Sequence, residues 1–208
     1  MMLTVQETPM PRRLALITGA SAGIGLAFAR LYAARGHDLA LVARRDDRLR
    51  EIARDLADRM DIEVIVIPAD LAEPTAPTRI LDRMAELERD VDVLINNAGY
   101  GLPGTFLNTT WEEQRDFIQV LLTAPCELTH KVLPGMVERR YGRIINVASL
   151  VSFTPGSKGH TLYGPVKAAL MRFSESIHAE IEGKGIHVTA LCPGLTYSEF
   201  HDANGTRE

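Results

Sequence analysis

Short hydrophobic runs recur along the chain and alternate with longer segments that show helical periodicity. The runs are rich in Val, Ile and Leu, and their apolar positions are nearly continuous. Such continuity is typical of parallel strands that are covered on both faces. The pattern predicts strands at Leu14–Thr18, Leu39–Ala43, Val64–Pro68, Val91–Ile95, Arg143–Val147 and His187–Leu191.

The segments between these runs are predicted to be helices. In DDRLREIARDLADRM, residues 46–60, apolar side chains recur every three or four positions, as on the buried face of a helix. Asp46 or Asp47 is available to cap its start. Repeated strand–helix alternation implies right-handed crossovers and an α/β fold with a single doubly wound parallel sheet and helices on both faces. Further helices are predicted near 24–35, 75–89, 110–138 and 161–183, with a bend at Pro125.

Composition narrows the class of protein. A chain of 208 residues that is 46% hydrophobic is expected to form one domain, with residues 1–12 as a lead-in. The net charge of −4, without a basic block, argues against nucleic-acid binding. No run is long enough to span a membrane, and the N-terminus lacks the order of a signal peptide. Cys126, Cys192 and the six histidines show no disulfide or metal-ligand spacing. We therefore expect a soluble cytoplasmic protein without a metal.

The carboxyl ends of the predicted strands carry the polar residues of interest. In an open parallel sheet these ends meet at one edge, where ligands bind. A polar residue after any one strand is ordinary, because loops are polar. Polar or turn-forming residues after all six strands together predict one site at this edge. They are Thr18 with the glycine turn, Arg44–Arg45, Asp70, Asn96–Asn97, Ser149 and Pro193–Gly194.

Three glycines follow the first strand in LITGASAGIGLAFARLYAARG, residues 16–36. Gly19 and Gly23 permit a tight turn, and Gly25 allows the next helix to pack closely on the sheet. A helix start near Ile24 offers free N–H groups and a positive dipole end, which suit a pyrophosphate. The spacing G-x-x-x-G-x-G differs from the dinucleotide pattern G-x-G-x-x-G, so the glycines alone are compatible with an ordinary turn. Their position between strand and helix favours a dinucleotide.

The end of the second strand indicates which dinucleotide. NAD-binding turns usually place an acidic residue there, whereas this chain has Ala43 followed by Arg44 and Arg45. Guanidinium groups suit a ribose 2′-phosphate, and Ser21 offers a further hydroxyl donor. We expect NADP (NADPH); the alternative is a solvated basic pair at a helix start.

The motif YGPVK places Tyr163 and Lys167 on one face of a helix. Pro165 fits only a first helical turn, so this helix is predicted to start close to Tyr163. A phenol with its ordinary pKa near 10 is a poor acid–base group at neutral pH, and the charge of Lys167, joined by an oxidised nicotinamide, is expected to lower that pKa. Ser149 is placed to hold a substrate carbonyl. These residues point to hydride transfer, in which a cofactor carries the chemistry.

Five motifs in this order resemble the short-chain dehydrogenase/reductase family over residues 14–198: TGASAGIG, NNAG, GRIINVAS, YGPVK and CPG. The resemblance implies an NAD(P)-binding Rossmann-fold oxidoreductase. It implies catalytic roles for Ser149 as substrate-orienting group, Tyr163 as acid–base, and Lys167 as the group that holds the nicotinamide ribose. It implies cofactor contacts from Gly19, Ser21, Gly23, Ile24 and Gly25 at the pyrophosphate and adenosine, Arg44 at the 2′-phosphate, Asp70 at the adenine edge, Asn97 along the ribose, and Pro193, Gly194 and Ser198 at the nicotinamide.

Three features depart from the family pattern. Leu121 stands where members usually have an asparagine that holds a water for proton relay, and leucine neither donates nor accepts a hydrogen bond. Ser149 and Tyr163 are one residue further apart than usual. The chain stops shortly after PGLTYSEF, so 195–208 is expected to be the start of a truncated substrate segment and the last strand to be missing. Family members bury the helices at 110–138 and 161–183 against partner subunits, which implies a homodimer or homotetramer.

The sequence therefore predicts an NADP-dependent oxidoreductase that interconverts a small-molecule ketone or aldehyde with an alcohol. The alternative is a catalytically weakened NADP(H)-binding protein that acts as a redox sensor or interaction module. Leu121 favours the alternative, whereas the intact Ser149, Tyr163 and Lys167 argue against it.

Overall fold

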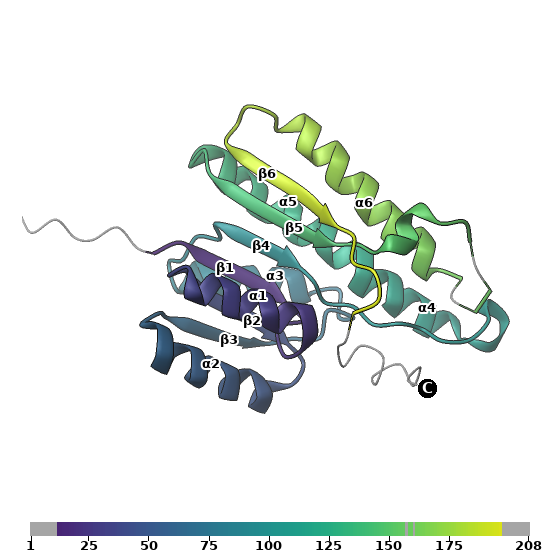
Figure 1. Cartoon of the computed structure of the whole chain (residues 1–208), viewed down its shortest axis with the longest axis horizontal. Helices are drawn as coiled ribbons and strands as arrows, with labels where there is room; N and C mark the ends of the chain where they lie inside the picture. Colours follow the sequence, from purple (N-terminus) through teal and green to yellow (C-terminus); the bar gives the residue numbers. More distant parts are fainter. Residues whose placement is uncertain (1–11, 157, 160, 197–208) are drawn as a thin grey trace, which may run out of the picture.

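A computed structural model describes residues 12–156, 158–159 and 161–196 (Figure 1). The predicted lead-in up to residue 11, Ser198 and the rest of the segment from residue 197 onward lie outside the described residues.

All strands of the described chain form one parallel sheet of six strands in the order β3-β2-β1-β4-β5-β6. The order reverses between β1 and β4, so the predicted doubly wound sheet is confirmed. The register is continuous across that point, because Leu16 of β1 pairs with Ala40 of β2 and with Leu94 of β4. The strands are β1 (Leu14–Thr18), β2 (Asp38–Ala43), β3 (Val64–Pro68), β4 (Val93–Asn96), β5 (Gly142–Val147) and β6 (Ile186–Leu191).

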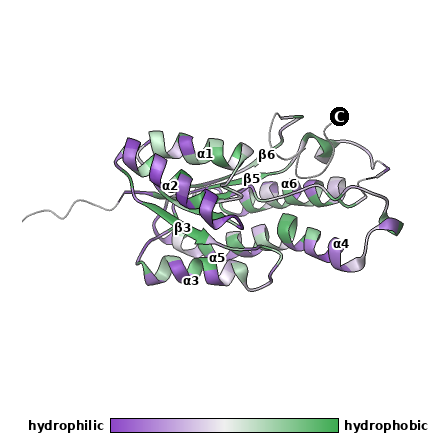
Figure 2. Ribbon diagram, turned by 90° about the horizontal axis from the view of Figure 1, so that it is seen from below, coloured by the Kyte–Doolittle hydropathy of each residue, from purple (hydrophilic) through white to green (hydrophobic). Residues whose placement is uncertain are grey.

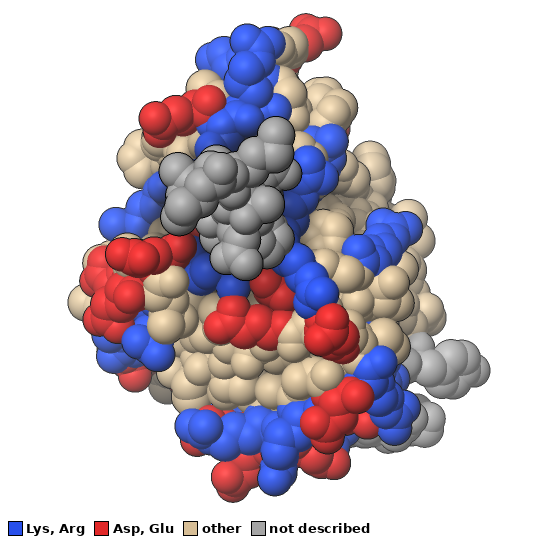
Figure 3. Space-filling model, turned by 90° about the vertical axis from the view of Figure 1, so that its left-hand side faces the viewer, with Lys and Arg blue, Asp and Glu red and all other residues tan. Residues whose placement is uncertain are grey.

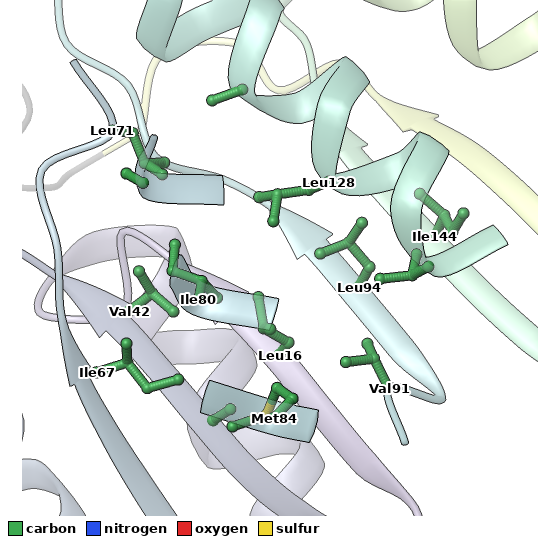
Figure 4. Close-up of a cluster of buried hydrophobic side chains, with 14 of the residues drawn as sticks. Leu16, Val42, Ile67, Leu71, Ile80, Met84, Val91, Leu94, Leu128 and Ile144 are labelled. Atoms are coloured by element: carbon green, nitrogen blue, oxygen red, sulfur yellow. The ribbon is translucent and has the colours of Figure 1, made fainter. Parts of the chain in front are cut away.

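Both faces of the sheet are covered by helices, which explains the unbroken hydrophobic runs (Figure 2). Successive strand residues point to opposite faces, and in β1, β2 and β4 both sets are buried. Leu16, Leu94 and Ile144 pack on one face in the cluster that Figure 4 shows in part. Ala15 and Ile17 pack on the other face against the first two helices. The helices are α1 (Gly23–Ala34), α2 (Asp46–Met60), α3 (Ala76–Glu86), α4 (Trp111–Ile118), α5 (Ala124–Glu138) and α6 (Tyr163–Glu180).

The start of α2 corrects one prediction. Neither Asp46 nor Asp47 is the N-cap: Arg45 occupies that position, and no side chain caps the helix. The two aspartates lie in the first turn instead, where negative charge is favourable at the positive end of the helix dipole. Asp46 is used there in an ion pair of 2.9 Å with Arg50, one turn further along. The sequence therefore predicted the N-cap of α2 at least one residue too late.

The segment predicted as one helix at 110–138 is not a continuous α-helix. A π-helical segment at Gln119–Thr123 joins α4 to α5. Pro125 is the second residue of α5; it has no N–H to donate to the carbonyl of Leu121 one turn earlier, and its ring crowds that carbonyl. A wider turn at this point is a common consequence. The start of α4 is sharply defined by a capping box between Thr110 and Glu113.

The edge where the strands begin is occupied by paired charges of both signs (Figure 3). Arg89 donates to Asp38 at 2.7 Å, and both side chains are largely buried. Arg12 pairs with Asp61 at 2.9 Å and Arg139 with Asp90 at 2.7 Å. Because the charges compensate one another, this edge carries no field of a single sign. In the part of the chain that the structure describes, no helix is long and apolar enough to cross a membrane.

Candidate active site

A cleft of about 1390 Å³ opens at the carboxyl ends of the strands and receives residues from the loop after each strand. It brings together twelve of the predicted site residues. Gly25 does not line the cleft, and Ser198 lies outside the described residues. The twelve are Gly19, Ser21, Gly23, Ile24, Arg44, Asp70, Asn97, Ser149, Tyr163, Lys167, Pro193 and Gly194.

The glycine turn is shaped by close backbone approaches within the protein itself. Gly19 and Gly23 have φ of 66° and 51°, values that side chains disfavour. A Cβ on Gly25 would lie 2.2 Å from the carbonyl oxygen of Gly19 and 2.5 Å from the side-chain nitrogen of Asn97. The missing side chain at Gly25 therefore serves the packing of α1 against the turn. It does not serve the approach of a ligand.

Asn97 holds the turn from the side of β4. Its Nδ2 donates to the carbonyls of Thr18 at 3.0 Å and Gly19 at 3.2 Å. Its backbone N–H donates to Thr18 Oγ1 at 2.9 Å. Asn97 thus joins β4 to the end of β1 and fixes the shape of the cleft floor, in addition to lining it.

The start of α1 fits the phosphate groups of a dinucleotide. Ala22 is the N-cap, and no side chain caps the helix. The first N–H groups of a helix have no hydrogen-bond partner within the helix. In α1 these groups lie beside the cleft, which Gly23 and Ile24 line. An uncapped helix start beside a turn of positive φ is the arrangement that binds phosphate.

The two arginines after β2 are both exposed and both line the cleft. Arg45 donates to Ser21 Oγ through Nη2 at 3.0 Å and through Nε at 3.3 Å. It therefore bridges the second loop to the glycine turn. No hydrogen bond or ion pair joins Arg44 to another described residue, so its guanidinium is available to an anion. Ser21 is 8% exposed at this corner.

The catalytic candidates meet at the other end of the cleft, where α6 begins at Tyr163 as predicted. Lys167 is 5% exposed, and its Nζ donates to the carbonyl of Val147 at 2.6 Å. This nitrogen lies 5.9 Å from the centroid of the Tyr163 ring. Ser149 follows β5; its Oγ accepts from the N–H of Val151 at 3.3 Å, and its side chain acts to lower the pKa of Tyr163.

The electrostatics of this end are set by burial. Burial raises the pKa of Tyr163 above its ordinary value, and Ser149 only partly opposes this. Burial lowers the pKa of Lys167 to about 8. The cause of both shifts is desolvation, which destabilises the charged form of both side chains. Lys167 is not among the groups that shift the pKa of Tyr163 here, and its predicted effect together with an oxidised nicotinamide stays a prediction.

Two aromatic residues that sequence reasoning missed support the tyrosine. The buried ring of Phe117 lies 6.4 Å from the Tyr163 ring and 5.4 Å from the Tyr100 ring, measured between centroids. Tyr100 also lines the cleft. Its position directly after NNAG, at a strand exit, was the available signal. Leu121 is buried nearby under Gly99, where a Cβ would lie 3.6 Å from Leu121 Cγ.

Sequence reasoning also missed a buried polar group behind the cleft. Asn146 of β5 and Ser174 of α6 are 0% and 1% exposed, and Asn146 Nδ2 donates to Ser174 Oγ at 2.8 Å. The available signal was a polar residue inside the hydrophobic run GRIINV, because asparagine is seldom fully buried without a partner.

Comparisons with known proteins agree on one family. The sequence model described as "short chain dehydrogenase" matches residues 13–208. The chain is 37% identical over 191 residues to "Nodulation protein G" of Rhizobium sp. (strain N33), covering 91% of this chain and 76% of that protein. A short-chain dehydrogenase from Sphingobium yanoikuyae in complex with NADPH has a TM-score of 0.88 and 37% identity, covering 94% of this chain and 75% of that one. L-Sorbose reductase from Gluconobacter frateurii, complexed with NADPH and L-sorbose, has a TM-score of 0.84 and 33% identity, covering 94% and 77%.

Proposed function

Because the chain belongs to the short-chain dehydrogenase family of NAD(P)-dependent oxidoreductases, we propose that it uses NADP(H) to interconvert a ketone or aldehyde with the corresponding alcohol. The observation that carries the proposal is one cleft with Arg44 and the glycine turn at one end and Ser149, Tyr163 and Lys167 at the other. The two structural neighbours named above, both bound to NADPH, support it.

The residues of the cleft fit the cofactor from end to end. The uncapped start of α1 would hold the pyrophosphate, and Arg44 would pair with a 2′-phosphate. Asp70, Asn97 and Ile24 would lie along the adenosine and ribose. Lys167, Pro193 and Gly194 would hold the nicotinamide end. The cofactor, when bound, supplies or accepts the hydride.

Tyr163 would move the proton. Its raised pKa keeps the phenol protonated at neutral pH, so its hydroxyl can donate to a carbonyl oxygen during reduction. Ser149, which lines the same end of the cleft, would donate to the same oxygen and fix its position. The ammonium of Lys167, held by the carbonyl of Val147, would stabilise the phenolate that remains. Apolar side chains of Leu150, Val151 and Leu195 border this end of the cleft and would contact the rest of the substrate.

Tyr163→Phe tests the assignment in a reductase assay with NADPH and a panel of apolar ketones and aldehydes. We expect kcat to fall at least about a hundredfold, because a general acid contributes about that much or more, while the Kd for NADPH changes little. Tyr141→Phe removes a hydroxyl outside the cleft lining and serves as the control. A rate retained by the Tyr163 variant would reject the proposed proton donor.

Leu121 supports a second candidate, a catalytically weakened NADP(H)-binding protein that senses redox state. This side chain is 1% exposed and offers no hydrogen bond at a position beside the cleft floor. Tight NADPH binding without turnover of any carbonyl compound in the panel would favour this candidate, especially if Leu121→Asn produced turnover. Turnover by the native chain would exclude it.

A further inference from the structure

A chain of buried hydrogen bonds links the middle of the sheet to α6. Asn96, the last residue of β4, donates through Nδ2 to Asn146 Oδ1 at 2.8 Å. Asn146 Nδ2 donates in turn to Ser174 Oγ at 2.8 Å, and Ser174 Oγ donates to the carbonyl of Leu170 at 2.7 Å. A side branch reaches α5, since Asn96 Nδ2 also lies 3.3 Å from Thr129 Oγ1. All four polar side chains are 3% exposed or less.

Ser174 lies on the face of α6 that carries the catalytic candidates. At about 100° per residue, Tyr163, Lys167 and Ser174 fall within about 40° of one another around the helix axis. Lys167 and Ser174 are two turns apart, about 10 Å along the axis. Two consecutive residues of β5 contact these two residues of α6. The Val147 carbonyl accepts a hydrogen bond from Lys167 Nζ, and Asn146 Nδ2 donates one to Ser174 Oγ.

We propose that Asn146 and Ser174 are positioning residues for the reaction, because their hydrogen bond sets the rotation and axial position of α6 that present Tyr163 and Lys167 to the cleft. Apolar packing alone is compatible with small rotations of a helix, whereas a hydrogen bond of 2.8 Å between two fully buried groups has one geometry. The two anchor points on β5 together oppose both rotation and sliding. This inference rests on the proposed role of Tyr163, and the experiment below separates the two.

Ser174→Ala removes the acceptor of Asn146, and Thr129→Val is the matched control. The control removes a buried hydroxyl from the same network but on α5, away from Tyr163 and Lys167. We expect kcat of Ser174→Ala to fall about tenfold to a hundredfold, as for displacements of about 1 Å at a reacting group. The Kd for NADPH should change less than about threefold, because the glycine turn and Arg44 lie on other elements. Thr129→Val should lower the unfolding midpoint without this loss of kcat.

A titration of the phenols gives a readout that does not need turnover. The ¹³Cζ resonance of Tyr163, assigned by its absence in Tyr163→Phe, should titrate at a shifted pH in Ser174→Ala and at the native pH in Thr129→Val. Ser174→Thr keeps the hydroxyl and should restore both kcat and the native titration. If the alanine variant does not fold, Ser174→Cys replaces it in both measurements. Cysteine keeps the side-chain shape but accepts hydrogen bonds weakly.

The outcomes are distinct. Native kcat and a native Tyr163 titration in a folded Ser174→Ala or Ser174→Cys variant would overturn the inference, as would an equal loss of kcat in Thr129→Val. Retained turnover in Tyr163→Phe would instead overturn the proposed function. A shifted Tyr163 titration in Ser174→Ala or Ser174→Cys, with a native titration in Thr129→Val, would support the positioning of Tyr163 by Ser174 whichever group donates the proton.

Discussion

Arg44 and Arg45 leave the same strand, yet the structure gives them different surroundings. Arg45 donates three hydrogen bonds to Ser21, two to its hydroxyl and one to its carbonyl, and shapes the corner of the cleft. Arg44 is exposed beside it, with no hydrogen bond or ion pair to another described residue. A guanidinium that is already engaged has fewer donors left for a ligand. At the residue scale, discrimination between NADP and NAD therefore rests on Arg44.

Arg44→Ala should raise the Kd for NADPH about tenfold to a hundredfold, since a charge-assisted hydrogen bond contributes about 1.5–3 kcal/mol. The Kd for NADH should change by less than about threefold, because NADH lacks the 2′-phosphate. Fluorescence titration of both cofactors measures the ratio. Arg50→Ala, which removes an arginine from α2 outside the cleft lining, is the control. Equal weakening of both cofactors would contradict the assignment.

Single residues show where sequence reasoning stops. The strand ends predicted Arg44 and Ser149 in the cleft, because the topology of a parallel sheet brings those positions together, and the YGPVK motif predicted Tyr163. The sequence did not predict the hydrogen bonds from Asn97 to Thr18 and Gly19, or from Asn146 to Ser174. These contacts join segments that are far apart in the chain. The rise of the Tyr163 pKa by burial was also not predicted, because desolvation depends on packing that no local pattern records.

Among the elements, the strands were predicted to within two residues at each end. The signal of β1, β2 and β4 is strong because both faces of these strands are buried, whereas β3 and β6 alternate buried positions with more exposed ones. Helix details were less predictable. The N-cap of α2 at Arg45 and the π-helical segment before Pro125 depend on which backbone groups find partners in three dimensions.

The junction of β1 and α1 depends on the absence of a side chain at Gly25. Gly25→Ala would place a Cβ 2.2 Å from the Gly19 carbonyl oxygen, so the helix and the turn must separate. We expect a loss of about 1–3 kcal/mol in the free energy of unfolding, as for other overpacked sites, together with weaker NADPH binding.

Gly164→Ala is the matched change for stability, because it lies in α6 and a Cβ there would meet nothing within 4 Å. Alanine has the better helix propensity, but the following Pro165 crowds a Cβ at this position, so we expect little net change in stability. Urea denaturation of both variants makes the comparison. An unchanged midpoint for Gly25→Ala would show that the turn relaxes freely and that close packing at this junction is not needed.

For the whole molecule, the buried ammonium of Lys167 makes stability depend on pH. Its pKa is about 8 in the folded chain, whereas in an unfolded chain it has the ordinary lysine value of 10.5. Between these two values the unfolded state keeps a proton that the folded state has released. Stability therefore rises with pH through this window. Below pH 8 both states are protonated, and the full cost of burying the charge remains.

Lys167→Met removes this group, so the difference in unfolding free energy between the native chain and the variant isolates its contribution. From pH 8 to 10.5 the native chain should gain up to about 3 kcal/mol relative to the variant, because one pKa unit corresponds to about 1.4 kcal/mol. Lys184→Met changes an exposed lysine and should show no such gain. Urea denaturation across this range measures the three curves. Parallel curves for the native chain and Lys167→Met would mean that the ammonium is solvated in the folded protein, contrary to its burial against the Val147 carbonyl.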